Sequence, residues 1–228
     1  KTVTAVYAGD NKYVFNATTE NFTVSKVKSS INGSLINVTV DDVPVGNVAR
    51  INISGPSDFN GTVVVEVDGV KYYVNMTNGL GFVEIAKLTN GTYSVNATLL
   101  ENDKYESSFN DTEKFNVYKL NTTVDIAVGN ITYGEVAHVV ITVDNVKAGN
   151  VTVSINNTSI VLPLLNGRAY WNVSGLAAGN YTVTANFAGN YKYNATSGTN
   201  KFEVKKAVPV ITVVVNPVQA GHSANITV

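Results

Sequence analysis

The sequence predicts an all-β protein built of tandem β-sandwich domains, and three observations lead to this prediction. Apolar and polar residues alternate with a period of two along most of the chain, and no window of a dozen residues shows a helical stripe. A ten-residue pattern also recurs at an interval of about 90 residues. That interval is too long for a solenoid repeat and close to the usual size of one small β domain.

The repeat is most visible in one motif. The pattern of Leu88–Ala97 returns at Leu176–Ala185, its end is found a third time at Thr2–Asp10, and a Lys-Tyr pair follows each copy. Aligning the copies predicts two whole domains between two partial ones. The expected boundaries are 1–25 for the last part of a preceding repeat, 26–118 and 119–206 for whole domains, and 207–228 for the first strands of a following repeat.

In each of the two partial repeats, the sequence pattern predicts one apolar sheet face that has no second sheet to cover it. The first face contains Val3, Ala5 and Tyr7, and the second contains Ile211 and Val213. An uncovered apolar face and open strand edges favour association. We expect these faces to be completed by adjacent repeats of a longer chain or by neighbouring copies in a fibre.

Individual strands follow from the alternation. Leu35–Val40, Tyr93–Leu99 and Asn150–Asn156 each place apolar residues at every second position, which is typical of a half-buried strand. Asn-Gly pairs that begin at residues 60, 78, 90 and 166 predict turns, because both residues tolerate a positive φ.

A tyrosine in the repeated motif narrows the fold to an immunoglobulin-like sandwich. Leu88-x-x-Gly91-x-Tyr93 and Leu176-x-x-Gly179-x-Tyr181 place a tyrosine at the start of a late strand, just after a corner. In a tyrosine corner the ring packs in the core and the hydroxyl bonds the backbone a few residues upstream. The alternative is a core tyrosine that begins an ordinary strand. We expect seven or eight strands in each whole domain.

These motifs resemble a known group of proteins. The Leu-x-x-Gly-x-Tyr-x-Val-x-Ala pattern, the Ala-Gly-Asp or Ala-Gly-Asn turn, the Lys-Tyr pair and a closing Phe-x-Val are similar to the immunoglobulin-like repeats of adhesin-like surface proteins of methanogenic archaea. The resemblance covers nearly the whole chain and implies an extracellular, non-enzymatic protein on the cell surface or in a surface filament. The first repeat has Leu99–Asp103 in place of the turn, so its late hairpin is expected to differ in shape.

The sequence contains nineteen Asn-x-Ser/Thr sequons, whereas thirty asparagines would give about five by chance. A strand surface composed of Asn, Ser and Thr produces sequons without any glycan, which leaves the alternative that they are by-products of composition. Asn is nevertheless depleted in strands, so its abundance favours covalent N-glycans. The candidate sites are Asn16, Asn37, Asn52, Asn60, Asn75, Asn90, Asn96, Asn121, Asn130, Asn150, Asn172, Asn180 and Asn194, with Asn60 and Asn90 in the most accessible turns.

Several function classes are disfavoured by composition. The net charge of −1 gives no basic surface for nucleic acid, and no apolar run is long enough to cross a bilayer, so we expect neither partner in this segment. There is no cysteine, and His138 and His222 have no partner at metal-ligand spacing. We expect no catalytic residue, cofactor or metal site. Trp171 fits a packed core position better than a sugar-binding platform.

Two functions remain. In the favoured one the chain is a structural stalk or filament segment, and the short junctions near Lys119 and Lys205, without Gly/Ser-rich linkers, indicate a semi-rigid array. In the alternative one it is an adhesion module whose loops bind a glycan or protein of a partner cell. The loops contain mostly Asn, Gly, Ser and Asp, which favours the structural function.

Overall fold

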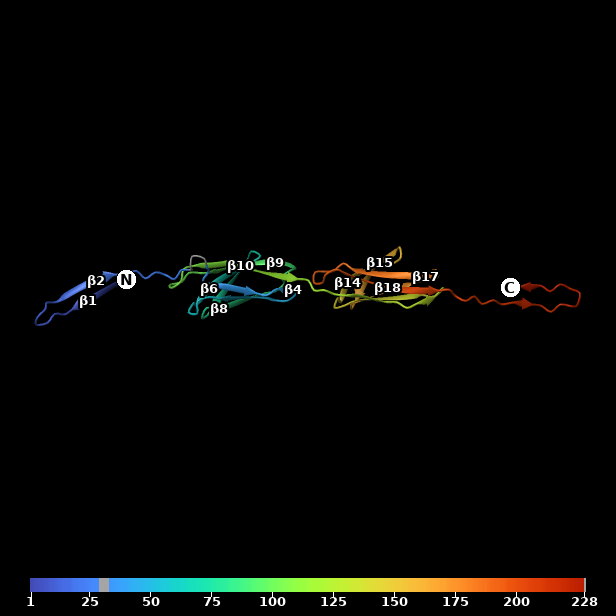
Figure 1. Ribbon diagram of the computed structural model, residues 1–228, viewed down its shortest axis with the longest axis horizontal. Coiled ribbons are helices and arrows are strands. Elements are labelled where there is room, and N and C mark those ends of the chain that lie inside the picture. Colours follow the sequence, from blue (N-terminus) through green and yellow to red (C-terminus); the bar gives the residue numbers. More distant parts are fainter. Residues whose placement is uncertain (29–32, 228) are drawn as a thin grey trace. The chain divides into compact units, whose positions relative to one another are not determined.

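The computed structural model describes residues 1–28 and 33–227, so Asn32, which begins one of the nineteen sequons, lies outside the described residues. The described residues form twenty strands and no helix (Figure 1). They divide into two compact units, Lys1–Lys119 and Leu120–Val228. Each unit contains one sandwich and one separate two-stranded hairpin.

The first sandwich packs a three-stranded sheet against a five-stranded sheet. The sheet orders are β3-β5-β8 and β4-β10-β9-β6-β7. The strands are β3 (Asn37–Val40), β4 (Val43–Pro44), β5 (Ala49–Ser54), β6 (Gly61–Val67), β7 (Val70–Met76), β8 (Leu80–Ile85), β9 (Gly91–Leu99) and β10 (Ser108–Tyr118).

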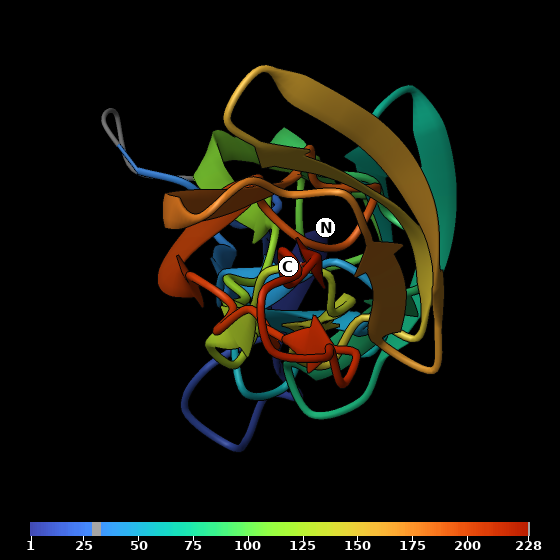
Figure 2. The ribbon, with the colours of Figure 1, turned by 90° about the vertical axis from the view of Figure 1, so that its right-hand side faces the viewer.

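The second sandwich has the same eight strands in one continuous hydrogen-bonded order, β11-β13-β16-β15-β14-β17-β18-β12. The continuity arises because β15 and β16 pair at Leu165 and Arg168, so the long β14–β15 hairpin, gold in Figure 2, connects the two faces. The strands are β11 (Val124–Ala127), β12 (Ile131–Thr132), β13 (Ala137–Val143), β14 (Ala148–Ile155), β15 (Thr158–Leu165), β16 (Arg168–Val173), β17 (Gly179–Phe187) and β18 (Thr196–Lys205).

The strand order is that of an immunoglobulin-like sandwich in both units. The first strand of each is split: β3 and β11 pair antiparallel with β5 and β13, whereas β4 and β12 pair parallel with the last strands, β10 and β18. The first strand thus changes sheets, and the chain crosses between sheets again before β9 and β17. The expected fold class, with eight strands in each domain, is confirmed.

The core of each sandwich lies where the alternation predicts. Ile36 and Val38 are buried while Asn37 is exposed, and Val151, Val153 and Ile155 are buried in the second sandwich. Each sandwich has its own buried apolar cluster, nineteen residues in the first and sixteen in the second. Since neither cluster draws residues from the other unit, each sandwich is a folding domain in its own right.

The two repeated tyrosines form the same contacts in both sandwiches. The Tyr93 hydroxyl donates to the Thr89 carbonyl at 3.0 Å, and the Tyr181 hydroxyl donates to the Ala177 carbonyl at 3.0 Å. Both rings are half-buried and stack on a phenylalanine of the last strand, at centroid distances of 5.5 and 5.4 Å. This is the geometry of a tyrosine corner, which links the late crossover to the strand that follows it.

Two of the four Asn-Gly pairs form positive-φ turns. Asn78 and Gly79 have φ values of 49° and 74°, and Asn166 and Gly167 have 51° and 81°, at the turns before β8 and β16. A Cβ on Gly79 would lie 2.3 Å from the Pro56 carbonyl oxygen, so only glycine fits there. The prediction is wrong for the Asn60 and Asn90 pairs, which precede β6 and β9 without positive φ because they enter strands instead of reversing the chain.

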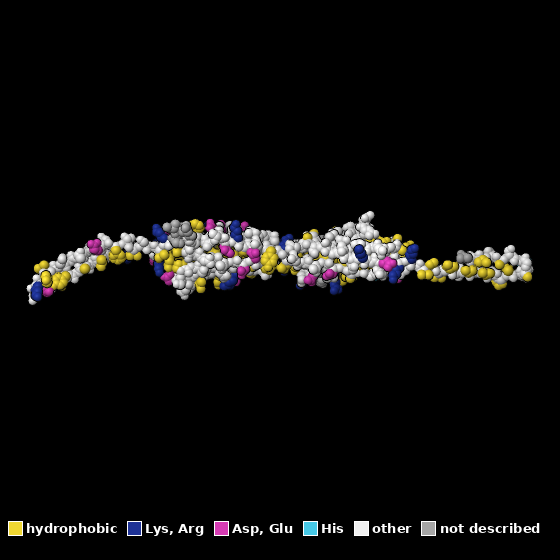
Figure 3. All heavy atoms as spheres, viewed as in Figure 1, with side chains coloured by type: hydrophobic (Ala, Val, Ile, Leu, Met, Phe, Trp, Pro, Cys, Tyr) yellow, Lys and Arg dark blue, Asp and Glu magenta, His cyan; other side chains and the backbone are white. Residues whose placement is uncertain are grey.

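The two ends of the chain form exposed hairpins. β1 (Thr2–Tyr7) pairs with β2 (Asn16–Asn21), β19 (Val214–Val215) pairs with β20 (Ile226–Thr227), and every residue of these strands is exposed. Apolar side chains line them, as the yellow atoms in Figure 3 show. Neither hairpin faces a second sheet within the described residues, so completion of these faces by adjacent repeats or neighbouring copies stays a prediction.

We expect Tyr181→Phe to lower the free energy of unfolding by about 1 kcal/mol, because it removes one hydrogen bond and keeps the ring. Tyr181→Ala should cost about 3 kcal/mol, because it also removes the stacked ring. Urea unfolding measures both. Tyr170→Phe is the matched control, since Tyr170 is exposed and its hydroxyl makes no hydrogen bond among the described residues. Equal losses at both positions would contradict the corner's role.

Candidate functional site

The Lys-Tyr pair of each repeat is positioned by one local motif, an Asx-turn. In each copy a side-chain oxygen accepts hydrogen bonds from the backbone N–H groups two and three residues further on, at 2.7 to 2.9 Å. The accepting residues are Asp10, Asn102 and Asn190. The late hairpin of the first whole repeat thus keeps the same turn, because Asn102 supplies the oxygen there. The expected difference in shape is found in the rest of this hairpin. Gly9 and Gly189 have φ values of 86° and 81°, whereas no residue of Leu99–Asp103 has a positive φ. The β9–β10 pairing also has a register shift between Asn110 and Glu113 that the β17–β18 pairing lacks.

The same loop holds the beginning of its own domain. The Val27 N–H donates to the Lys104 carbonyl at 2.7 Å, and the Leu120 N–H donates to the Lys192 carbonyl at 2.9 Å. The chain segment that enters each sandwich is therefore hydrogen-bonded to the loop between the last two strands of that sandwich.

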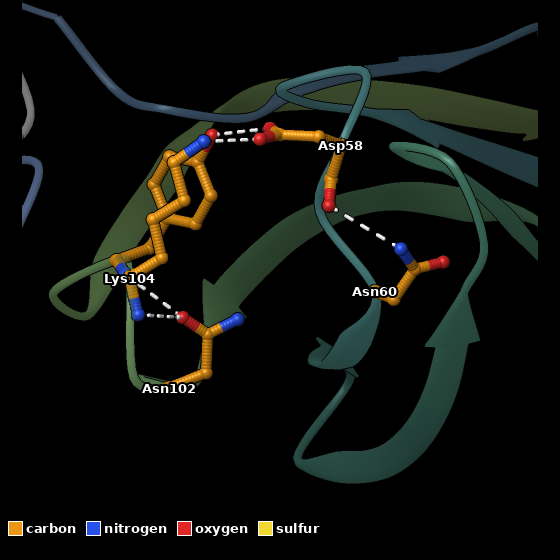
Figure 4. A network of polar contacts seen from close by, with 5 residues as sticks. Asp58, Asn60, Asn102 and Lys104 are labelled. Carbon is orange, nitrogen blue, oxygen red and sulfur yellow. Dashed lines mark hydrogen bonds and ion pairs between the residues drawn. The ribbon is translucent and has the colours of Figure 1, made fainter.

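In the first sandwich this loop carries a charged network (Figure 4). Asp58, in the loop between β5 and β6, forms an ion pair with Lys104 and accepts a hydrogen bond from the Tyr105 hydroxyl. The Tyr105 ring is buried edge-to-face against Phe59 at a centroid distance of 5.8 Å, so only its hydroxyl reaches the surface. Phe59 and Tyr105 therefore position the two ends of the network.

The network holds its groups in their ordinary charged states. The hydrogen bond from Lys104, and then that from Tyr105, lowers the pKa of the Asp58 carboxyl, and Asp58 raises the pKa of Lys104 and of Tyr105. A protonated lysine is not a nucleophile, and an ionised carboxylate is not an electrophile. The arrangement is consequently a structural ion pair that connects two loops.

The sequence did not indicate this network, because Asp58 and Lys104 lie far apart in the chain and are brought together by the sandwich. In the second sandwich Lys192 lies 5.8 Å from the centre of the Tyr193 ring. All five ion pairs among the described residues belong to the first unit. The two domains thus differ in the ion pairing of this loop.

The other titratable candidates do not converge on a site. The His138 Nδ1 lies 2.8 Å from the Asn172 Oδ1 on the outer face of the second sandwich, and His222 is exposed in the C-terminal hairpin. Within residues 1–28 and 33–227, no three His, Cys, Asp or Glu side chains are grouped to hold a metal ion. Trp171 is half-buried against the second core, which agrees with the interpretation as a core residue.

The candidate glycosylation sites all have exposed side chains. They lie on strands of the outer faces, on the N-terminal hairpin and in loops. The positions of Asn60 and Asn90, which directly precede β6 and β9, are not equivalent. The Asn60 side chain accepts from the Asn78 N–H and donates to the Asp58 carbonyl, whereas Asn90 forms no side-chain hydrogen bond with the described residues. Asn90 is therefore the more accessible of the two.

Comparison with known proteins gives structural neighbours only. No family model matches the chain, and no curated protein matches it. Among solved structures, fibronectin(III)-like modules of Clostridium thermocellum CbhA are 13% identical, with 75% of this chain and 94% of that chain covered and a TM-score of 0.33. The Yersinia pseudotuberculosis adhesin InvE is 14% identical, with coverages of 77% and 62% and a TM-score of 0.33.

A putative membrane-anchored protein of Corynebacterium diphtheriae is also 14% identical, with 93% of this chain and 60% of that chain covered and a TM-score of 0.36. Similarity at this level says nothing of ligand or partner, and the fold class rests on strand order and register. In the part of the chain that the structure describes, no helix is long and apolar enough to span a membrane.

The Asp58 network predicts acid sensitivity in the first sandwich. Because the folded-state pKa of Asp58 is depressed, its contribution is present above its ordinary pKa of about 3.9 and is lost as the pH falls through the folded value. We expect Asp58→Asn to lower the melting temperature of this domain at pH 6 and to have a progressively smaller effect below about pH 4.

Calorimetry between pH 2 and 7 measures this difference. Asp103→Asn is the control, because Asp103 is exposed in the same loop and forms no side-chain contact among the described residues. An Asp58→Asn effect that is constant across this pH range would show that the ion pair is not its origin.

Proposed function

We propose that this chain is a non-enzymatic structural segment of a long cell-surface protein or filament, in which immunoglobulin-like domains follow one another and carry N-linked glycans. The observation that carries the proposal is the shortness of the connection between domains. The Tyr118 carbonyl still accepts from the Val45 N–H of the first sandwich, and the Leu120 N–H already donates within the second. Only Lys119 lies between them.

A connection of this length supports an array that resists bending. A flexible linker needs several residues without hydrogen bonds, whereas each end of this one is held by its own domain. The weakly charged surface supports the same proposal, because charged side chains cover only a small part of the face of each sandwich drawn in Figure 3. Such a surface suits a solvated spacer better than a tight interface.

The glycan coat is the second part of the proposal. Every candidate asparagine is an exposed residue, and several lie on strands, where asparagine is disfavoured. At an occupied site an Nδ2–C1 bond to the sugar replaces one N–H bond. A donor in which C1 is esterified to phosphate supplies the sugar, the C1–O bond breaks, the phosphate leaves, and the transferring enzyme takes the amide proton.

The location follows from the same argument. A glycan-bearing array of this type fits the outside of a cell, and the motif resemblance supports the surface of a methanogenic archaeon. The partners within such an assembly would be adjacent repeats of the same chain or neighbouring copies in a fibre.

A second candidate function is adhesion through the loops. The observation in its favour is the difference in charge between corresponding loops, since the Asp58–Lys104 pair occurs in the first sandwich alone among the described residues. A screen of the chain against immobilised glycans and partner-cell proteins distinguishes the two functions. Binding that Asp58→Asn abolishes would favour adhesion over the structural function.

We expect protein from its native source to be heavier than the 24.3 kDa polypeptide by several oligosaccharides. Intact-mass measurement and glycopeptide mapping test this, with unglycosylated recombinant chain as the control. An unmodified native mass would show that the sequons are by-products of composition.

We also expect the two sandwiches to reorient together in solution. Insertion of Gly-Ser-Gly-Ser after Lys119 should uncouple them, because it adds residues that neither domain holds. Relaxation rates of backbone ¹⁵N measure the rotational correlation time of each domain, which should fall on insertion. Equal correlation times for the two proteins would contradict the semi-rigid array.

A further inference from the structure

Several aromatic rings of the sandwiches are exposed without any role in the core, and three of them lie on β7, β8 and β16. The exposed fractions are 72% for Tyr73 on β7, 51% for Phe82 on β8 and 60% for Tyr170 on β16. Their neighbours along the strand, such as Val74 and Ala169, point inward and are buried. Because successive side chains of a strand point to opposite faces, these three rings point to solvent. They therefore gain no stabilisation from burial.

A sequon asparagine lies beside each of these rings on the same face. Asn75 follows Tyr73 by two positions, and Asn172 follows Tyr170 by two positions, so each pair is separated by roughly 6.6 Å along its strand. Asn52 on β5 is directly opposite Phe82 on β8. Each of these asparagine amides thus lies close enough to an aromatic ring for a sugar attached to the amide to reach that ring.

The amides of these three asparagines are oriented in the same way. The Oδ1 atom of Asn172 lies 2.8 Å from the His138 Nδ1, that of Asn75 accepts from the Thr62 hydroxyl at 3.4 Å, and that of Asn52 accepts from the Arg50 Nε at 3.2 Å. None of the three Nδ2 atoms forms a hydrogen bond with a described residue. The oxygen is held, and the nitrogen that would take a sugar is unengaged.

Other sequons lack this arrangement. The Asn194 Nδ2 donates to the Asn121 Oδ1 at 2.9 Å, and the Asn110 Nδ2 donates to the Ile36 carbonyl at 3.2 Å. Asn96 is flanked along its strand by Ser94 and faces Glu66, with no aromatic ring directly opposite. The combination of an exposed ring, a held Oδ1 and an unengaged Nδ2 is therefore specific to a subset of sites.

We propose that Tyr73 and Tyr170 are stacking platforms for the first sugar of N-linked glycans on Asn75 and Asn172. This inference rests on the proposed glycan coat and specifies the two sites at which the first sugar is held by stacking. One face of a pyranose ring consists of C–H groups, which pack on the negative face of an aromatic ring and remove apolar area from water. Stacking of this kind orders the glycan and stabilises the strand that carries it.

Phe82 is the weaker platform. The Arg50 guanidinium lies 3.5 Å from the centre of the Phe82 ring and also pairs with Glu84 at 2.9 Å, so it already occupies one face of that ring. Tyr73 and Tyr170 have no such cation over them among the described residues. The same Tyr-x-Asn-x-Thr/Ser arrangement therefore occurs once in each sandwich, on β7 in the first and on β16 in the second.

The test is a double-mutant cycle on the whole chain secreted from yeast, whose glycans begin with N-acetylglucosamine. Tyr170→Ala is measured in the glycosylated chain and in the Asn172→Gln chain, which has no sugar at that site. We expect Tyr170→Ala to lower the melting temperature of the second sandwich by roughly 4 °C more when the sugar is present. Trimming the glycan to its first sugar should leave this difference unchanged, because that sugar makes the contact.

The matched control is Ser94→Ala with Asn96→Gln, where no aromatic ring is replaced and no coupling is expected. Tyr73→Ala with Asn75→Gln repeats the test in the first sandwich. Occupied Asn172 and Asn75 with no coupling in either cycle would overturn the stacking proposal and leave the glycan coat intact. Asn172 and Asn75 left empty while Asn96 is occupied would also overturn it. A native protein without glycans would overturn only the proposed glycan coat. The double-mutant cycles in protein secreted from yeast test the stacking platforms independently.

Discussion

Burial of one face of each strand against an opposite sheet is the constraint on which this structure depends. Most strands of the two sandwiches bury alternate residues, so they are stable only when two sheets cover each other's apolar faces. The split first strand and the tyrosine corner serve this arrangement, because each helps to fix a crossover of the chain between the two sheets. The exposed terminal hairpins lack this cover: β1 alternates as the sandwich strands do, but no second sheet within the described residues covers its apolar residues.

The composition of the outer faces follows from the alternation that buries the inner faces. A period of two that buries valine and isoleucine sends the intervening residues to solvent, and in this chain those residues are mainly Asn, Ser and Thr. A surface of this kind carries little charge to repel or attract neighbours, so solubility has to come from polar groups and, in our proposal, from sugars. The same geometry explains why asparagine and an aromatic ring two residues apart lie side by side. An unusual surface composition and a possible function thus share one physical origin.

The two domains illustrate how a repeat diverges without losing its fold. The core clusters, the tyrosine corners and the Asx-turns are shared, whereas the Asp58–Lys104 ion pair occurs in the first sandwich only, among the described residues. Asn102 and Asn190 form the same turn although the residues around them differ, because only one side-chain oxygen is needed to bind the two backbone N–H groups. Asp58 forms its ion pair because the turn at Asn102 holds Lys104 opposite it. Loops can therefore change their chemistry while the backbone that presents them stays the same.

The sequence by itself determined the all-β class, the repeat, the inward and outward faces of the strands and the expectation that the hydroxyls of Tyr93 and Tyr181 bond the backbone a few residues upstream. These are local or periodic properties, which depend on residues a few positions apart. Only the tertiary structure decided which Asn-Gly pairs reverse the chain, which lysine meets Asp58, and which sequon amides are held by a neighbouring strand. Those features join residues that are distant in sequence, and the register of the sheets, which brings Asn52 opposite Phe82 and His138 opposite Asn172, is set by the packing of both sheets together.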